Sequence, residues 1–477
     1  MSAQTFQLRL TAWFSRWSTL PFLWRILIIL AAFGLLPLFI HSDYILRVLG
    51  NVCMFAALAV ALNVVVGYAG LLDLGFVAFY GLGAYMYGLL SSPQLGLHWP
   101  SWASLIIVAL LSIGFGLLLG SPSLRLSGDY LAIVTLGFGL IFVQLSNTLD
   151  KIQLPGRATP LNLTGGANGL INIDALHFMD FKLASVTQYF YVLLIWLAIV
   201  LVVVYHLNQS RVGRAWRSMG EDVLAAEIMG MPTRRLKLLA FATGACVAGI
   251  TGGLFAAWQG SAFPQNFAAD VLINLYAMMV LGGIGNLGGA VLGASVLSIV
   301  PEILRNPDLI RVMFYFGLVI GLLGFTRPRR DGVIVLGGVF ALGVVVRVLA
   351  GWLFPALVSP PTIVVANAAV ATALERAAQQ FGILTQWWML ILKNPQAAGN
   401  LAFVALIPAL LGLARIKPGP LKLAATIPVL YVLAFVWEAR LTAEPAVTRL
   451  LLVGGLLVVM MVFRPHGLLG RRKVEIV

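Results

Sequence analysis

The chain of 477 residues is 60% hydrophobic and only 10% charged, and its mean hydropathy is +0.97. This composition excludes a soluble globular domain and indicates a polytopic membrane protein. The formal net charge of +14 does not indicate nucleic-acid binding, because the basic residues gather in short loops between apolar runs and near the two ends of the sequence.

Apolar runs taken in chain order predict an all-α polytopic membrane protein with about 10 core transmembrane helices. The first run follows Arg9, Arg16 and Arg25. No small-residue cleavage site follows it before Asp43, so we expect it to be an uncleaved helix. The expected core spans are residues 25–40, 45–66, 71–90, 101–120, 129–148, 186–206, 238–258, 269–288, 290–304 and 309–326.

The positions of the basic residues predict the orientation of these spans. With residue 1 placed inside, alternation puts Arg125, the loop that begins at Arg211 and the cluster Arg327–Arg330 on the cytoplasmic side. The loop from Asp150 to Ser185, where the charges balance, then lies outside. Three separate clusters agree with one phase of alternation, as the positive-inside rule requires.

The last third of the chain is less regular, and its apolar runs add about four spans, at residues 332–354, 398–414, 423–437 and 447–463. If both ends of the chain are cytoplasmic, residues 361–397 must either form an outer-surface or re-entrant element or cross the membrane twice. We therefore divide the chain into a basic segment with the first helix (1–42), a core (43–326) with a cytoplasmic loop at 207–237, an inserted membrane region (327–446), and a closing helix with a basic tail (447–477).

One long basic loop, from His206 to Leu238, lies between two apolar spans. Within it, Ser218 with Glu221 three residues later forms a capping-box pattern, and Gly230 followed by Pro232 is a helix stop. These signals predict a short helix of about three turns. Its small-residue face, which would fit a groove on another protein, comprises Met219, Val223, Ala226 and Gly230. The alternative is a solvated connector helix that lies on the bilayer.

Several neutral polar residues fall in or near the expected spans and are candidates for the lining of a path for a zwitterion. They are Asn63, Gln144, Asn147, Gln259, Asn274 and Asn286. Hydrogen bonds between helices are the alternative explanation for each of them. Asp73 and Asp129 lie near the cytoplasmic ends of their spans, where we expect ordinary solvation at the interface.

The outer loop contains the string TGGANG, in which the candidate docking residues are Thr164, Gly165, Gly166, Asn168 and Gly169. Glycines at this spacing permit a tight turn. Such a turn could form a rim on which a soluble substrate-binding protein docks, and a turn without a binding role is the equal alternative.

No catalytic or metal-binding set is visible in the sequence. The five histidines, at positions 41, 98, 177, 206 and 466, fall in loops or near span ends, and Cys53 and Cys246 lie inside apolar runs. The phosphate-binding pattern G-x-x-x-x-G-K-[ST] does not occur. We therefore expect no catalytic residue, no metal and no cofactor bound by this chain, and any ATP must be hydrolysed by another subunit.

Four glycine-rich strings occur in a fixed order: LNVVVGYAGLLDLGFVAFYGLGAYMYGLL from Leu62, LRLSGDYLAIVTLGFG from Leu124, TGGANG from Thr164 and LGGIGNLGGAVLGA from Leu281. With the basic loop between the third and the fourth, they resemble the LivM-type permease of bacterial ABC importers for branched-chain amino acids. The resemblance covers about residues 43–326 and could close with the last helix and its string FRPHGLLG, and the insertion of about 120 residues after Arg330 departs from it.

The resemblance implies an inner-membrane protein, and the distribution of basic residues predicts that its N- and C-termini are cytoplasmic. The resemblance also implies four partners besides the lipid bilayer: a second homologous permease subunit, two ATPases that use Mg-ATP, and an extracytoplasmic substrate-binding protein. Residues 218–230 would be the helix that couples to the ATPase, with Ser218, Glu221, Ala225, Ala226, Gly230 and Pro232 as its site residues. Leu224 stands where the glutamate of the importer EAA loop would be.

Two other functions compete with this one. Similar permeases move urea or short amides, and nothing in the sequence excludes that cargo. An ion-coupled secondary amino acid transporter would require a carboxylate or another ion site at mid-membrane depth, and the first ten expected spans offer almost none.

Overall fold

A computed structural model describes residues 22–39, 42–123, 129–152, 162–178, 181–325, 329–355, 358, 373–417 and 419–470. Arg9, Arg16, Arg125, Arg327 and the tail beyond Gly470 lie outside the described residues. The chain divides into two compact units, one made of residues 1–299 and 457–477, the other of residues 300–456. The second unit begins before α14 (Pro307–Phe325), so this helix packs with the helices of the inserted region.

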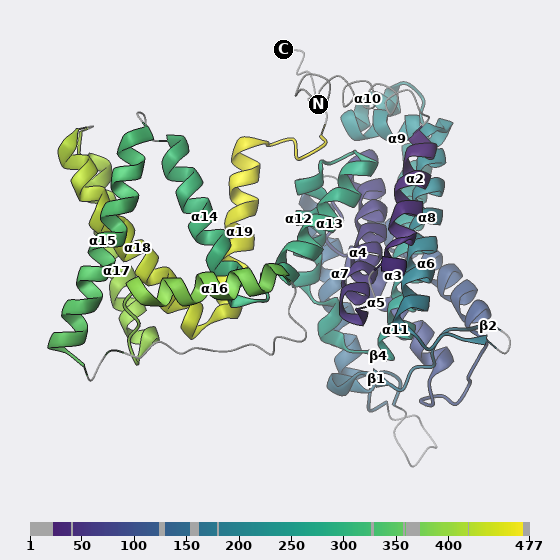
Figure 1. Ribbon diagram of the computed structural model, residues 1–477. Coiled ribbons are helices and arrows are strands. Elements are labelled where there is room, and N and C mark those ends of the chain that lie inside the picture. Colours follow the sequence, from purple (N-terminus) through teal and green to yellow (C-terminus); the bar gives the residue numbers. More distant parts are fainter. Residues whose placement is uncertain are drawn as a thin grey trace, which may run out of the picture. The chain divides into compact units, whose positions relative to one another are not determined.

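The first unit is helical, and its helices overlap the expected spans (Figure 1). The helix in the span expected at 269–288 has only 14 residues, ends at Gly282 and is not among those long and apolar enough to cross a membrane. The span expected at 25–40 is interrupted after Gly34, and the cytoplasmic loop holds two short helices, α9 and α10. The helices are α2 (Phe22–Gly34), α3 (Leu36–Phe39), α4 (Asp43–Leu62), α5 (Phe76–Ser91), α6 (Ser101–Ser123), α7 (Asp129–Thr148), α8 (Val186–Gln209), α9 (Arg211–Glu221), α10 (Val223–Ile228), α11 (Thr233–Gln259), α12 (Ala269–Gly282) and α13 (Leu287–Ile303).

Short non-α elements connect these helices. α4 continues as a π-helical turn, η1 (Asn63–Tyr68), and two 3₁₀ turns, η2 (Gly166–Asn168) and η3 (Pro264–Phe267), follow later. The only strands among the described residues are four of two residues each, on the side of the unit opposite α9 and α10 (Figure 1). β1 (Leu170–Ile171) pairs antiparallel with β4 (Ser261–Ala262), and β2 (His177–Phe178) pairs with β3 (Phe181–Lys182).

Glycines let the central helices of the first unit pack backbone against backbone. A Cβ atom at Gly83 of α5 would overlap the carbonyl oxygen of Gly249 in α11, and one at Gly252 would overlap that of Tyr80. Larger side chains at these positions would push the two helices apart. The helix α4, which also packs here, is almost wholly buried from Val52 to Leu62.

The second unit has its own buried core, formed by Tyr315, Val335, Val339, Met389, Tyr431 and Ala434. Arg311 donates to both oxygens of Glu438, at 2.9 and 3.0 Å, and this buried pair joins α14 to α18. Phe314 and Trp437 stack at 4.4 Å beside it. The helices are α14 (Pro307–Phe325), α15 (Arg329–Leu353), α16 (Ala373–Trp388), α17 (Pro395–Arg415), α18 (Pro420–Ala443) and α19 (Pro445–Phe463), and the last of these ends in the first unit.

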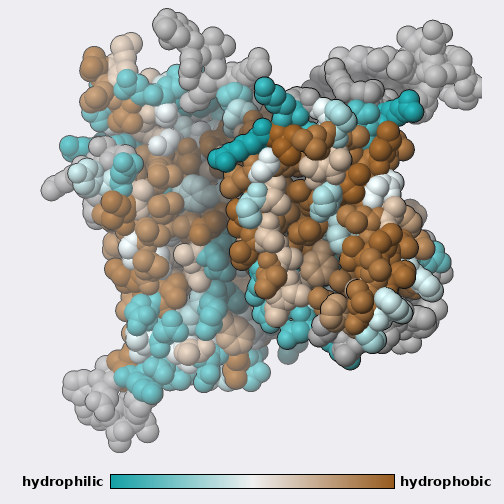
Figure 2. All heavy atoms as spheres, turned by 90° about the vertical axis from the view of Figure 1, so that its left-hand side faces the viewer, coloured by the Kyte–Doolittle hydropathy of each residue, from teal (hydrophilic) through white to brown (hydrophobic). Residues whose placement is uncertain are grey.

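Ten helices in the described part of the chain are long and apolar enough to cross a membrane. Four of them, in the ranges 330–353, 395–415, 420–443 and 445–463, are the spans expected in the last third. Shorter apolar helices at 28–39, 76–90 and 287–303 account for three more expected spans. α16 is not among the spanning helices and runs across its neighbours within the second unit (Figure 1). Apolar residues cover the middle of the visible surface, and hydrophilic residues gather toward its ends (Figure 2).

Candidate coupling and translocation site

The basic loop folds as two short helices that lie beyond the ends of the spans (Figure 1). α9 is capped by Ser210, whose side chain accepts a hydrogen bond from the amide of Gly213. Its apolar face is buried, and the indole of Trp216 donates to the carbonyl of Leu236 at 2.9 Å. α9 is therefore held rigidly against the start of α11.

α10 is fixed at both ends. The carboxylate of Asp222 accepts from the amides of Leu224 and Ala225, at 2.8 and 3.0 Å, which caps the N-terminus. At the other end Gly230 has φ of +80°, and the hydroxyl of Thr233 donates to Glu227 at 2.6 Å. A capped, pinned helix of this kind moves as one body.

Two details of the predicted helix are wrong. Ser218 does not begin a helix: it lies within α9 and its hydroxyl donates to the carbonyl of Arg214, because Asp222 provides the cap instead. The small-residue face is not free for a partner either, since Met219 and Ala226 are buried in the chain itself. The helix stop at Gly230 is confirmed by its left-handed backbone.

The exposed face of α10 is apolar. Leu224, Ile228 and Met229 are 71%, 85% and 79% exposed, and Ala225 is exposed beside them. Arg214 and Arg217 of α9 bind the carbonyls of Gln209 and Asn208. Exposed apolar side chains on a rigid helix outside the spans are typical of a surface that contacts another protein.

The segment from Ala69 to Gly75 connects this loop to the helices of the core. A Cβ atom at Gly70, whose φ is +69°, would lie 2.8 Å from the Cα of Gly220 in α9. On its other side, the amide of Leu74 donates to Thr135 of α7 at 2.9 Å, and the hydroxyl of Tyr276 in α12 donates to the carbonyl of Asp73 at 2.7 Å. One non-helical segment thus touches α9, α7 and α12.

Asp73 is buried in this segment, contrary to the solvation expected at the interface. It is 1% exposed, one carboxylate oxygen accepts from the amide of Gly75 at 2.9 Å, and the other has no hydrogen-bond partner among the described residues. Burial raises the pKa of this carboxyl from 3.8 to about 7. Asp129, by contrast, is exposed at the start of α7.

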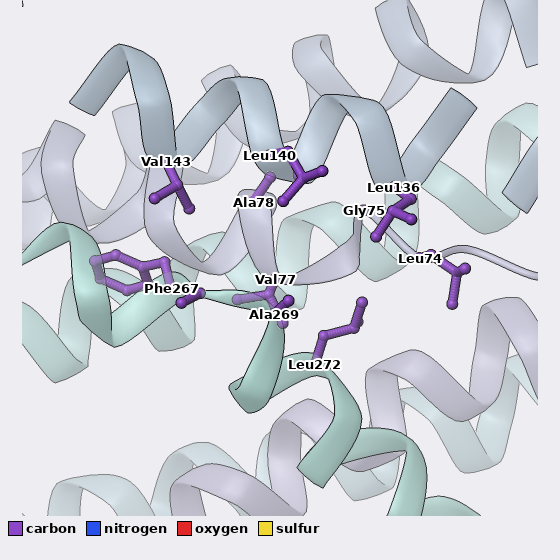
Figure 3. Close-up of a pocket in the computed structure, with 12 residues that line it drawn as sticks. Leu74, Gly75, Val77, Ala78, Leu136, Leu140, Val143, Phe267, Ala269 and Leu272 are labelled. Atoms are coloured by element: carbon purple, nitrogen blue, oxygen red, sulfur yellow. The ribbon is translucent and has the colours of Figure 1, made fainter. Parts of the chain in front are cut away.

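An apolar pocket lies directly beside this segment, between α5, α7, η3 and the start of α12 (Figure 3). Gly75 makes the close packing at its edge possible, because a Cβ atom there would overlap the carbonyl of Thr135. A wider opening continues along α7 past Gln144. The pocket is lined by Leu74, Gly75, Val77, Ala78, Leu136, Gly139, Leu140, Val143, Phe267, Ala268, Ala269 and Leu272.

The structure separates the candidate path residues into two groups. Gln144 and Asn274 are exposed on α7 and α12, the two helices that flank the pocket, and Gln259 is exposed at the end of α11. Asn63, Asn147 and Asn286 instead bond to backbone groups: Asn63 accepts from the amide of Gly285, Asn147 donates to the carbonyl of Val143, and Asn286 bonds to Leu469 and Gly289.

The TGGANG string forms a tight turn at the opposite side of the unit. Gly165, Gly166 and Gly169 all have positive φ values, and the amide of Gly166 donates to the hydroxyl of Thr164. A Cβ atom at Gly169 would overlap the carbonyl of Ala262. Asn168 is exposed at the tip. The glycines are therefore needed for the turn itself, and the docking role stays a prediction.

Sequence reasoning missed the exposed apolar face of α10 and the role of Gly70. Both features left a signal in the sequence. Leu224 and Ile228 are four residues apart and so share one face of a helix, and Gly70 lies between two consecutive expected spans, 45–66 and 71–90. The described residues include no group of three or more His, Cys, Asp and Glu side chains that could hold a metal ion.

A bundle of apolar helices with a flanking pocket and a rigid helix pair outside the spans defines a polytopic membrane protein. The chain belongs to the family described as branched-chain amino acid transport system / permease component, which matches residues 44–323. It is thus a transport component, a multi-pass protein of the inner membrane.

The curated relatives agree with this family. The chain is 35% identical to the high-affinity branched-chain amino acid permease protein LivM of Escherichia coli over 309 residues, which cover 58% of this chain and 69% of the relative. It is 27% identical to BraD of Pseudomonas aeruginosa over 57% of the chain and 90% of the relative. LivH of Escherichia coli is 31% identical over 26% of the chain and 40% of the relative. No solved structure matches.

Proposed function

We propose that this chain is a transmembrane subunit of an ABC importer and forms part of the path by which branched-chain amino acids, delivered by a substrate-binding protein, cross the membrane. The names of LivM, LivH and BraD support this cargo, since all three are called high-affinity branched-chain amino acid permease proteins. Separate subunits hydrolyse ATP and drive the cycle.

One observation carries the coupling role: α10 is capped at both ends and presents Leu224, Ile228 and Met229 to solvent. An ATPase that closes on ATP must push on an element that does not deform, and α10 is such an element. Its motion would reach the core through Gly220 and Gly70, whose backbones are in contact.

A second, homologous permease subunit covers the pocket face in this proposal. α7 exposes apolar side chains along its length, among them Ile133, Leu140 and Ile141, beside the polar Gln144. The similarity of this chain to both LivM and LivH supports a pair of related subunits. A path between two such faces, with the neutral amides of Gln144 and Asn274 nearby, suits a zwitterion because no fixed charge traps it.

The orientation follows from the same assignment. The side with α9 and α10 faces the cytoplasm, where the ATPases are, and both termini lie on that side. The TGGANG turn then faces the compartment from which the substrate-binding protein arrives, and Asn168 at its tip contacts that protein.

Affinity purification from native membranes in mild detergent tests the proposal, with the accompanying proteins identified and counted by mass. We expect two ATPases and one second permease subunit for each copy of this chain. Recovery of the chain alone, in a form that moves substrate down an ion gradient in liposomes, would instead establish a secondary transporter. Uptake of urea or short amides in preference to leucine would change the cargo and leave the importer intact.

A further inference from the structure

The C-terminal segment His466–Gly470, which we call the clasp, lies outside the residues that match the family but packs onto the first unit. The amide of Leu468 donates to the carbonyl of Leu281 at 2.8 Å, and the amide of Leu469 donates to the carbonyl of Gly282 at 3.0 Å. Both acceptors belong to the last turn of α12. The side-chain amide of Asn286 donates back to the carbonyl of Leu469 at 2.6 Å.

These bonds satisfy groups that a helix leaves open. The last four carbonyls of an α-helix have no hydrogen-bond donor within the helix. Water or a donor from another part of the chain must bond to them. For α12, two of these donors come from the clasp, a segment far away in the sequence. The clasp is therefore the C-terminal cap of α12.

Two glycines make the contact possible. A Cβ atom at Gly467, whose φ is +78°, would lie 2.6 Å from the amide nitrogen of Gly283. One at Gly283, whose φ is +113°, would lie 2.6 Å from the amide nitrogen of Gly470. Side chains at these positions would separate the two segments and break the hydrogen bonds beside them.

The turn that the clasp holds is in contact with η1 on its other side. The amide of Gly285 donates to Asn63 at 2.8 Å, and a Cβ atom at Gly67 would lie 2.7 Å from that same amide nitrogen. η1 leads directly into the segment that touches Gly220 of α9. Clasp, turn, η1 and α9 are consequently joined by successive backbone contacts.

We propose that the clasp is a positioning element of the transport cycle, which holds the end of α12 so that movement of the coupling helices reaches the pocket wall that α12 forms. This rests on the proposed function. Without the clasp, the carbonyls of Leu281 and Gly282 lose their donors. The end of α12, whose Tyr276 binds the carbonyl of Asp73, is then held less firmly. ATP hydrolysis then proceeds without productive movement of the path.

The test compares two truncations in the complete importer, reconstituted in liposomes with its binding protein. Deletion of residues 466–477 removes the clasp, whereas deletion of residues 471–477 removes only the basic tail and is the matched control. We expect the control to transport leucine within twofold of the full chain. The longer deletion should retain assembly and basal ATP hydrolysis. Its transport rate, and the stimulation of its ATP hydrolysis by loaded binding protein, should each fall at least tenfold.

A point variant covers the case in which the longer deletion fails to assemble. Gly467→Ala should reduce transport and stimulation together, whereas Gly288→Ala, at the start of α13 and with only ordinary contacts around its Cβ position, should not. Full transport by the longer deletion, or equal transport by the two point variants, would overturn the role of the clasp. Absence of ATP-driven transport in the full chain itself would instead refute the proposed function.

Discussion

The backbone of Gly70 lies against the backbone of Gly220, with 2.8 Å between the position of a Cβ atom at Gly70 and the Cα of Gly220. Gly220 belongs to α9, and Gly70 belongs to the segment that binds α7 and α12 through Leu74 and Asp73. This contact therefore connects the proposed ATPase-binding helices to the segment beside the pocket.

Enlarging Gly220 tests this connection. A Cβ atom there would lie 2.7 Å from the carbonyl oxygen of Tyr68, so Gly220→Val should force α9 away from the segment. We expect the transport rate to fall at least about tenfold, which corresponds to about 1.4 kcal/mol of activation free energy. Leucine uptake and ATP hydrolysis are to be measured on the same proteoliposomes. Unchanged stimulation of hydrolysis by the binding protein would show that the contact transmits nothing.

Bulk at Gly230 should block docking of the ATPase. Gly230 has φ of +80° and nothing within 4 Å of its Cβ position, so Gly230→Ala and Gly230→Trp suffer the same backbone strain but differ in size. We expect Gly230→Trp to abolish substrate-stimulated ATP hydrolysis while it still inserts in the membrane, and Gly230→Ala to retain most of it. Equal losses in the two variants would assign the effect to backbone strain alone.

A charge on the exposed face of α10 should weaken ATPase binding. Ile228 is 85% exposed, so Ile228→Glu leaves the fold of this chain unaffected and acts only on the partner. A few residues at the centre of an interface each contribute about 2 kcal/mol or more, and an unpaired carboxylate buried there costs more, so we expect co-purified ATPase to fall at least about tenfold. Ile171→Glu, at an apolar residue of β1 that is 57% exposed and lies outside the spans, is the control and should leave ATPase recovery unchanged.

The stability of the chain should fall as the pH rises through 7. Burial raises the pKa of Asp73 to about 7, so the folded state binds this proton more tightly than the unfolded state, and the stabilisation present below pH 4 is lost between pH 4 and 7. Asp73→Asn keeps an oxygen for the amide of Gly75 and cannot ionise. The variant should lose less thermal stability than the wild type between pH 5 and pH 8 in detergent. Parallel losses would mean that another group is responsible.

Breaking the buried ion pair of the second unit should destabilise that unit. Glu438→Ala leaves Arg311, which is 8% exposed, with only Asp308 as an acidic partner, at a cost of about 3–5 kcal/mol. The double change Arg311→Met with Glu438→Leu should recover most of the loss in apparent Tm. Arg305→Ala, in an exposed pair with Glu302, should cost less than about 1 kcal/mol.

Apolar run length was sufficient to predict the spans, because a helix that crosses lipid must be apolar over its whole length. The boundaries near the cytoplasm were harder. Ser218 and Glu221 have the spacing of a capping box, but Asp222 competes for the same function one turn later and provides the cap. Local patterns cannot decide between two capping residues when tertiary contacts, here those of Trp216 and Met219, fix where the first helix ends.

The contacts that join distant segments could not be read from the sequence. Asn63 and Asn286 are of the neutral polar type expected along a path for a zwitterion. Each nevertheless bonds to a backbone group that the fold brings close: Asn63 to the amide of Gly285 and Asn286 to the carbonyl of Leu469. The packing of α14 with the inserted helices likewise depends on the pairing of Arg311 with Glu438, which no local pattern predicts.

Leucine uptake into proteoliposomes that contain the purified importer, with every ion gradient collapsed by ionophores, tests the central claim most directly. The account predicts uptake that requires both loaded binding protein and ATP on the side of the membrane that α10 faces. This uptake should persist without any ion gradient. Uptake by this chain alone, without ATP and abolished by the ionophores, would contradict it.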